Sequence, residues 1–169
     1  MGNKSLGVVV TGGTSGIGLA MAREFLSAGD RVVICGRDRG RLDSALDRLS
    51  RDVPEGGLYG TICDVSAPEA VAALAAFASS KLGIVDRWIN NAGSAGKMKR
   101  PLWELDLSDI DEVCRTNLAG SMLLCAEAVR LMRRQPAHDG PPCYHIYNMG
   151  FSAAGARSSP TAVPHRASK

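Results

Sequence analysis

The chain of 169 residues has the length of one domain, and its hydrophobic content of 45% is sufficient for a buried core. Its formal net charge of +3 is too small to indicate a nucleic-acid partner, and we expect none. Five widely spaced cysteines without a C-x-x-C pair argue against a zinc site and for reduced thiols, so no metal site is predicted.

Apolar, strand-like runs alternate with helical patterns along the whole chain, which is typical of an α/β protein. The predicted strands are 6–11, 31–35, 58–63, 85–90 and 144–149. The predicted helices are 16–28, 38–49, 66–80 and a long one that ends at 134. Right-handed crossovers then give a doubly wound, Rossmann-type parallel sheet with strand order 3-2-1-4-5, and a ligand crevice above strands 1 and 4.

Two of these helices carry predictions about their ends and faces. Ser66 is expected to cap the third helix, with Pro68 in its first turn. Asp106 or Ser108 is expected to cap the long helix. The expected inner face of the long helix carries six residues: Ile110, Val113, Leu118, Cys125, Val129 and Met132.

A glycine-rich stretch, Thr11–Gly18, joins the first strand to the first helix. Glycine permits the turn and a close approach to a pyrophosphate, which the helix N-terminus attracts. The spacing is G-x-x-x-G-x-G rather than the G-x-G-x-x-G fingerprint, so an ordinary strand-to-helix loop remains an alternative. The candidate cofactor-binding residues here are Thr11, Gly12, Thr14, Ser15, Gly16, Ile17 and Gly18.

Arg37 follows the second strand, about 20 positions beyond the glycine turn, where a residue that binds the adenosine ribose is expected. A guanidinium can pair with a 2′-phosphate in two hydrogen bonds, which favours NADP(H). Asp38 could instead accept a hydrogen bond from a 2′-hydroxyl, so NAD(H) stays an alternative. Arg37, Arg39 and Arg41 could also form only a solvated basic face.

Three further motifs stand at the expected places: Cys63-Asp-Val65, Asn90-Asn-Ala-Gly93 and Thr116-Asn117. Together with Thr11–Gly18, they resemble the short-chain dehydrogenase/reductase family in order and spacing. The resemblance implies an NAD(P)-binding domain over 1–169. It also implies that Asp64 and Val65 contact adenine, that Asn91, Ala92 and Gly93 support the cofactor, and that Asn117 holds a water of a proton relay. A buried helix asparagine bonded to backbone is the alternative for Asn117.

The same resemblance assigns the remaining catalytic positions near the end of the chain. Ser152 would hold the substrate carbonyl oxygen, and Lys169 would bind the nicotinamide ribose. The family's tyrosine is replaced by His165, whose ordinary pKa of about 6.5 suits general acid chemistry, although the charge of Lys169 disfavours its protonated form. The alternative is a chain with impaired catalysis.

Within the family, the segments 87–94, 116–124, 145–149 and 158–163 are similar to chlorophyll b reductases. This resemblance implies reduction of the C7 formyl group of chlorophyll b to hydroxymethyl with NAD(P)H, in the chloroplast, with thylakoid association. The alternatives are a non-catalytic dinucleotide-binding relative or partner subunit, and a reductase of another lipid or small carbonyl.

The resemblance also implies strands beyond position 169, so we expect a domain that is incomplete at its C-terminus. An exposed edge strand and an apolar long helix then predict marginal stability and a homo- or hetero-oligomer. No apolar run has the length of a membrane span, and only Met1–Ser5 precede the first strand. We therefore expect no signal or transit peptide in this chain, and without the resemblance a cytoplasmic location would be expected.

Overall fold

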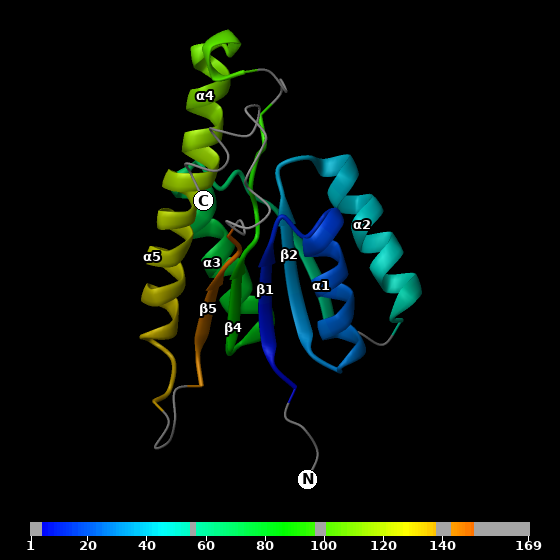
Figure 1. Cartoon of the computed structure of the whole chain (residues 1–169). Coiled ribbons are helices and arrows are strands. Elements are labelled where there is room, and N and C mark those ends of the chain that lie inside the picture. The colour runs from blue at the N-terminus through cyan, green and yellow to red at the C-terminus, as the bar shows by residue number, and fades with distance from the viewer. Residues whose placement is uncertain (1–4, 55–56, 97–100, 138–142, 151–169) are drawn as a thin grey trace.

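The computed structural model describes residues 5–54, 57–96, 101–137 and 143–150, with the Leu102 side chain excepted. Its centre is a parallel sheet of five strands in the order β3-β2-β1-β4-β5, which confirms the predicted doubly wound topology (Figure 1). The strands are β1 (Gly7–Thr11), β2 (Arg31–Gly36), β3 (Gly57–Ile62), β4 (Arg87–Asn90) and β5 (His145–Asn148).

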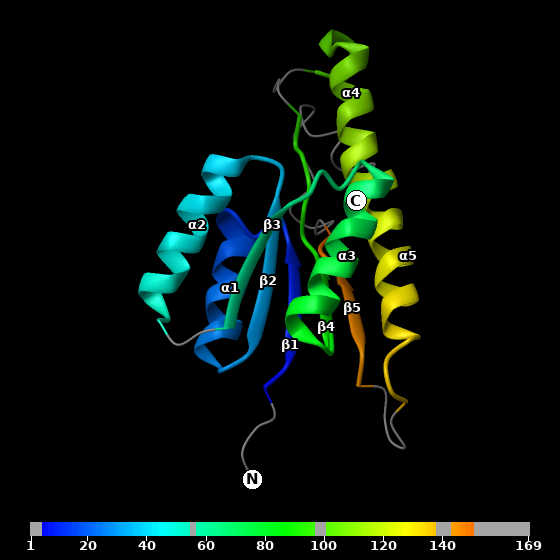
Figure 2. The ribbon, with the colours of Figure 1, turned by 180° about the vertical axis from the view of Figure 1, so that it is seen from behind.

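Helices cover both faces of the sheet, as the two opposite views show (Figures 1 and 2). One face is covered by α1 (Gly16–Ser27) and α2 (Arg39–Asp52). The other is covered by α3 (Pro68–Leu82) and by α5 (Gly120–Met132). α5 is the last part of a long helical stretch that begins with η1 (Leu102–Glu104), α4 (Leu107–Cys114) and η2 (Arg115–Ala119), and its α4 end extends beyond the strands (Figure 1). In the described part of the chain, no helix is both long and apolar enough to cross a membrane.

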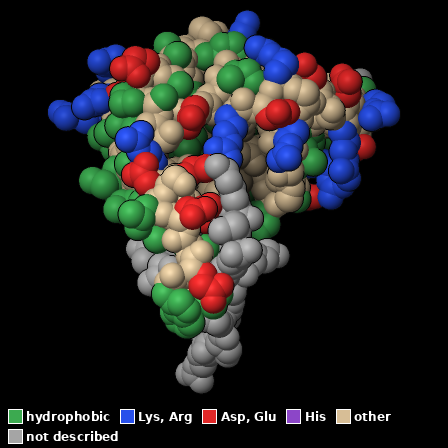
Figure 3. Space-filling model, turned by 90° about the horizontal axis from the view of Figure 1, so that it is seen from above, with side chains coloured by type: hydrophobic (Ala, Val, Ile, Leu, Met, Phe, Trp, Pro, Cys, Tyr) green, Lys and Arg blue, Asp and Glu red, His purple; other side chains and the backbone are tan. Residues whose placement is uncertain are grey.

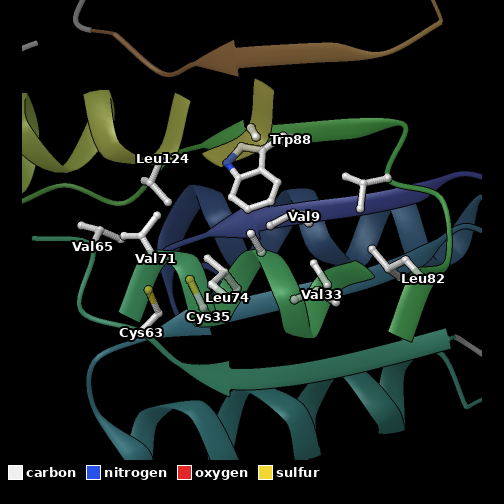
Figure 4. Packing of buried hydrophobic residues seen from close by; sticks show 14 of the residues in the cluster. Val9, Val33, Cys35, Cys63, Val65, Val71, Leu74, Leu82, Trp88 and Leu124 are labelled. Atoms are coloured by element: carbon white, nitrogen blue, oxygen red, sulfur yellow. The ribbon is translucent and has the colours of Figure 1, made fainter. Parts of the chain in front are cut away.

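The central strands are apolar on both sides because helices bury both faces of the sheet. In β1, Val9 points into the layer shared with α3 and α5, whereas Val8 and Val10 point towards α1 and α2. Trp88 is fully buried in the layer between the sheet and helices α3 and α5, where it lies against Val9 and Leu124 (Figure 4). This alternation fixes the sheet between the helices and places the carboxyl ends of β1 and β4 side by side.

The start of α3 corrects one expectation. Ala67, rather than Ser66, holds the N-cap position, and Pro68 begins the helix. The backbone N–H and hydroxyl of Ser66 both donate to a carboxylate oxygen of Asp64, at 2.9 and 2.8 Å. The Ser66 side chain therefore takes part in an Asp-x-Ser turn with Asp64 and does not cap α3.

The expected inner face of the long helix was wrong at two positions. Leu118 and Val129 are 53% and 44% exposed, while Leu124 and Ala128 are buried. The buried residues of this stretch follow one another at the ordinary helical intervals of three or four positions: Asp109, Val113, Asn117, Gly120, Leu124, Ala128 and Met132. Leu118 and Val129 each stand one position after a member of this row and therefore face outward. Within η2, the N–H of Gly120 bonds the Arg115 carbonyl five residues earlier, which is a π-helical turn. The N-cap of α4 is Asp106, one of the two predicted residues, although its side chain forms no capping bond.

Candidate functional site

The turn after β1 has the conformation that its glycines permit. Gly12 and Gly16 have φ values of +65° and +54°, in the left-handed region that other residues rarely adopt. The N–H of Gly13 bonds the carbonyl of Cys35 at 3.1 Å, which ties the turn to the end of β2. Ser15 holds the N-cap position of α1, but its side chain does not cap the helix. The first N–H groups of α1 can therefore bind an anion.

A hydroxyl group connects this turn to the loop after β4. The Oγ1 of Thr11 accepts hydrogen bonds from the N–H groups of Asn91 at 3.1 Å and Ala92 at 3.0 Å. It also donates to the carbonyl of Ile89 at 3.3 Å. In return, the side-chain amide of Asn91 donates to the carbonyls of Thr11 and Gly12, at 3.0 and 3.3 Å. These bonds set the positions of the two loops relative to each other.

Gly18 permits the closest contact of this arrangement. A Cβ atom at this position would lie 2.4 Å from the Gly12 carbonyl oxygen and 2.5 Å from the Asn91 amide nitrogen. Real Cβ atoms do not approach so closely, so α1 can begin here only with glycine. The sequence had predicted this role, the close packing of the helix against the strand.

A cavity of about 510 Å³ lies at the carboxyl end of the sheet, between the turn after β1 and the loop after β4. This is the edge where the predicted strand order places a ligand crevice. The predicted residues that line it are Gly12, Thr14, Ser15, Arg37, Asp64, Val65, Asn91, Ala92 and Gly93. Four others do not line it: Thr11, Gly16, Gly18 and Ile17, the last of which is 64% exposed.

Charged groups of both signs surround the cavity. A nitrogen of the Arg37 guanidinium lies 3.3 Å from a carboxylate oxygen of Glu112 in α4. The Asp38 carboxylate accepts the N–H of Arg41 at 2.7 Å and so caps α2. Figure 3 looks onto this end of the molecule and shows basic and acidic side chains close together. The cavity rim is therefore mixed in charge rather than uniformly basic.

Asp64 is held ionised by its neighbours. The backbone N–H of Ser66, ahead of the Ser66 hydroxyl and the charge of Arg37, lowers the pKa of Asp64 from its ordinary 3.8, although burial opposes the shift. At neutral pH, the side chain at this corner of the cavity is therefore a carboxylate and only accepts hydrogen bonds.

Asn117 lies in η2, and its side chain is 1% exposed. Its amide oxygen accepts the N–H of Ser94 at 2.8 Å, and its amide nitrogen donates to the Ser94 carbonyl at 2.9 Å. The side chain thus holds the loop after β4 against the long helix, as in the alternative that the sequence left open. Its role toward a relay water stays a prediction.

Asp38, the alternative partner for a 2′-hydroxyl, also lines the cavity. Six further lining residues were not among the predicted site residues: Cys35, Gly36, Arg41, Cys63, Ser94 and Thr116. The buried Cys35 and Cys63 lie side by side (Figure 4). A hydrogen bond with Cys63, and then burial, raise the pKa of the Cys35 thiol, so it is a neutral thiol. The sequence could have indicated Cys35 and Cys63 as site residues, because they stand at the carboxyl ends of β2 and β3.

The predicted catalytic residues Ser152, His165 and Lys169 lie outside the described residues. Within the described part, no group of three or more His, Cys, Asp or Glu side chains could hold a metal ion. What the described residues do fit is a nucleotide with a pyrophosphate. They supply a turn in which a Cβ at Gly12, Gly13 or Gly18 would meet another atom within 3 Å, a helix N-terminus and an adjoining cavity.

The family model described as short chain dehydrogenase matches residues 7–169. The chain belongs to the short-chain dehydrogenase family. It is 41% identical over 162 residues to chlorophyll(ide) b reductase NOL, chloroplastic, from Oryza sativa subsp. japonica. The match covers 96% of this chain but 46% of that relative, so the chain spans less than half of the relative's length.

Solved structures of the family share the fold. A variant of actinorhodin polyketide ketoreductase with NADPH has a TM-score of 0.83 and 30% identity, over 99% of this chain and 61% of that chain. An NADPH-bound short chain oxidoreductase from Pseudomonas aeruginosa PAO1, described as containing an atypical catalytic center, has a TM-score of 0.81 and 27% identity. That match covers 98% of this chain and 62% of the other.

Proposed function

We propose that this protein is an NAD(P)H-dependent oxidoreductase that reduces the C7 formyl group of chlorophyll b to a hydroxymethyl group. One observation carries the proposal. The cavity at the carboxyl end of the sheet, with its glycine turn, stands in a chain that is 41% identical to a chlorophyll(ide) b reductase over 96% of its length. Because that relative is described as chloroplastic, the proposal includes a chloroplast location.

The described residues would hold the cofactor by its adenosine half. The turn from Gly12 to Gly16 and the N-terminus of α1 would bind the pyrophosphate. Asp64 and Val65 would contact the adenine, and Arg37 would bind a 2′-phosphate, which favours NADP(H) over NAD(H). When bound, a reduced nicotinamide supplies the hydride that the formyl carbon accepts.

The proton for the formyl oxygen must come from this chain or from water. In the proposal, Ser152 donates a hydrogen bond to that oxygen and His165 releases its proton to it. Lys169 binds the nicotinamide ribose. One hydride and one proton convert the aldehyde to the primary alcohol.

His165 also supports a second candidate function. Because this histidine stands where the family has a tyrosine, the chain could bind the dinucleotide as a partner subunit without turnover. A third candidate function is the reduction of another lipid or small carbonyl. The assay described next tests it when other aldehydes replace chlorophyll b.

The test compares wild type with His165→Tyr and with the matched control His165→Phe, which keeps a ring but cannot transfer a proton. Each protein receives detergent-solubilised chlorophyll b with NADPH or NADH, and chromatography measures the hydroxymethyl product. We expect wild type and His165→Tyr to form product and His165→Phe to be slower by about 10²–10⁴-fold. If all three bind NADPH by calorimetry and none forms product, the catalytic proposal fails and the partner-subunit candidate is favoured.

We further propose that the protein self-associates. Leu118, Met122 and Val129 are exposed along one side of η2 and α5, and they supply an apolar surface for a second copy or a related subunit. Light scattering after size-exclusion chromatography should show an oligomer. A monodisperse monomer with a sharp thermal transition would contradict this proposal.

A further inference from the structure

Arg37, the residue proposed to bind a 2′-phosphate, already has an anionic partner. Its guanidinium lies 3.3 Å from Glu112, which comes from α4, 75 positions further along the chain. The Arg37 side chain is 61% exposed and that of Glu112 is 27% exposed. The pair therefore connects the end of β2 with the long helix at the rim of the cavity.

A second carboxylate also faces this guanidinium. The charge of Arg37 contributes to the lowered pKa of Asp64, after the hydrogen bonds from Ser66, so the two side chains interact. Among the described residues, two guanidiniums and two carboxylates line this cavity, and the Glu112 carboxylate adjoins it through its ion pair with Arg37. The lining groups belong to Arg37, Arg41, Asp38 and Asp64. The carboxylates thus offset the positive charge that would attract a phosphate dianion.

A 2′-phosphate and the Glu112 carboxylate need the same donors. The phosphate can pair with the guanidinium in two hydrogen bonds only after the 3.3 Å contact opens or is shared. In the bound state, the two anions would also repel each other across the guanidinium. A 2′-hydroxyl carries no charge, so its binding does not require this exchange.

We infer that Glu112 is a specificity-determining residue that limits the preference of this site for 2′-phosphorylated dinucleotides over their unphosphorylated counterparts. The inference rests on the proposed dinucleotide function. It assigns the selectivity to a pair: Arg37 favours the phosphate, and Glu112 opposes it. A protein with this pair would accept NADP(H) and NAD(H) with a smaller difference than Arg37 alone would give.

The test measures binding to the full chain with two simple probes, adenosine 2′,5′-bisphosphate and 5′-AMP, by titration calorimetry. The variant is Glu112→Gln, which keeps the shape and removes the charge. The matched control is Asp111→Asn. The preceding residue of the same helix carries the same charge but pairs with Arg115, at 3.0 Å, instead of with Arg37.

We expect Glu112→Gln to tighten the Kd for adenosine 2′,5′-bisphosphate by about three- to tenfold, since exposed ion pairs and nearby like charges have effects of this size. The Kd for 5′-AMP should stay within about twofold, and Asp111→Asn should change neither. In an Arg37→Ala background, Glu112→Gln should have a smaller effect, which a double-mutant cycle measures.

The outcomes separate the inference from the function on which it rests. Equal changes for both probes, no change for either, or the same gain with Asp111→Asn would overturn the role of Glu112 while leaving the dinucleotide site in place. If wild type binds neither probe, both the inference and the proposed function fail. Circular dichroism of each variant checks that the helix content is retained.

Discussion

Replacing Thr11 by valine should separate the loop after β4 from the turn after β1 without changing the size of the side chain. Thr11 is completely buried, and its hydroxyl accepts the N–H groups of Asn91 and Ala92. Valine fills the same space but removes this acceptor. A lost acceptor for a buried donor costs about 1–3 kcal/mol, and both donors here are partly buried, so we expect a loss of about 2–4 kcal/mol in the free energy of unfolding.

Thr11→Ser is the matched control. It keeps the hydroxyl and removes one buried methyl group, which costs about 1 kcal/mol. Urea unfolding, followed by the fluorescence of the buried Trp88, measures the free energy of each variant. Because the loop from Asn91 to Ser94 lines the cavity, Thr11→Val should also weaken the binding of 5′-AMP. If Thr11→Val is no less stable than Thr11→Ser, the hydroxyl does not hold these loops together.

Two further predictions concern the cradle and the carboxylate beside it. Gly18→Ala would place a Cβ 2.4 Å from the Gly12 carbonyl oxygen, so it should cost about 2 kcal/mol or more in urea unfolding. Gly16→Ala meets no atom within 4 Å and should cost only the positive-φ strain, about 1–2 kcal/mol. Equal losses would contradict the packing argument. Since the folded-state pKa of Asp64 is lowered, its contribution to stability is present above pH 3.8 and is lost as the pH falls through the folded value. Acid titration of unfolding should show this loss, Asp64→Asn should lack it, and Ser66→Ala should reduce it.

The strand order could be predicted from the sequence because each strand is a short apolar run with a helical pattern after it. The repeated crossovers then leave few topologies for a parallel sheet. The glycine turn was predictable for a related reason. Positive φ at Gly12 and the contact of Gly18 with backbone are requirements that only glycine meets, so the residue type itself carries the information.

The face of the long helix was predicted only in part, because the prediction counted apolar residues alone. The buried row keeps helical intervals of three or four, but it also contains Asp109, Asn117 and Gly120. A Cβ on Gly120 would lie 3.0 Å from the carbonyl oxygen of Val65, so this glycine allows the helix to approach the cavity. Such long-range packing is not contained in a local apolar pattern.

Charge pairing across the cavity is also invisible in the sequence. Arg37 was recognisable from its distance to the glycine turn, but Glu112 is 75 positions away and lies in the last turn of the acidic helix α4. The same applies to Ser94, whose backbone bonds the side chain of Asn117. In both cases the sequence reveals one partner by its place in a motif, and only the fold reveals the other.

The contacts that form the nucleotide side of the site all lie within the described residues before position 120. Thr11 with Asn91, Ser94 with Asn117 and Arg37 with Glu112 join the turn, the loop and the helix into one unit. The residues assigned to proton transfer come later in the chain, from Ser152 onward. Nucleotide affinity and turnover therefore depend on different segments. Substitutions at Thr11 or Gly18 should change the Kd of both adenosine probes, and Glu112→Gln should change only that of adenosine 2′,5′-bisphosphate. Substitutions at His165 should change the rate and leave these Kd values unaltered.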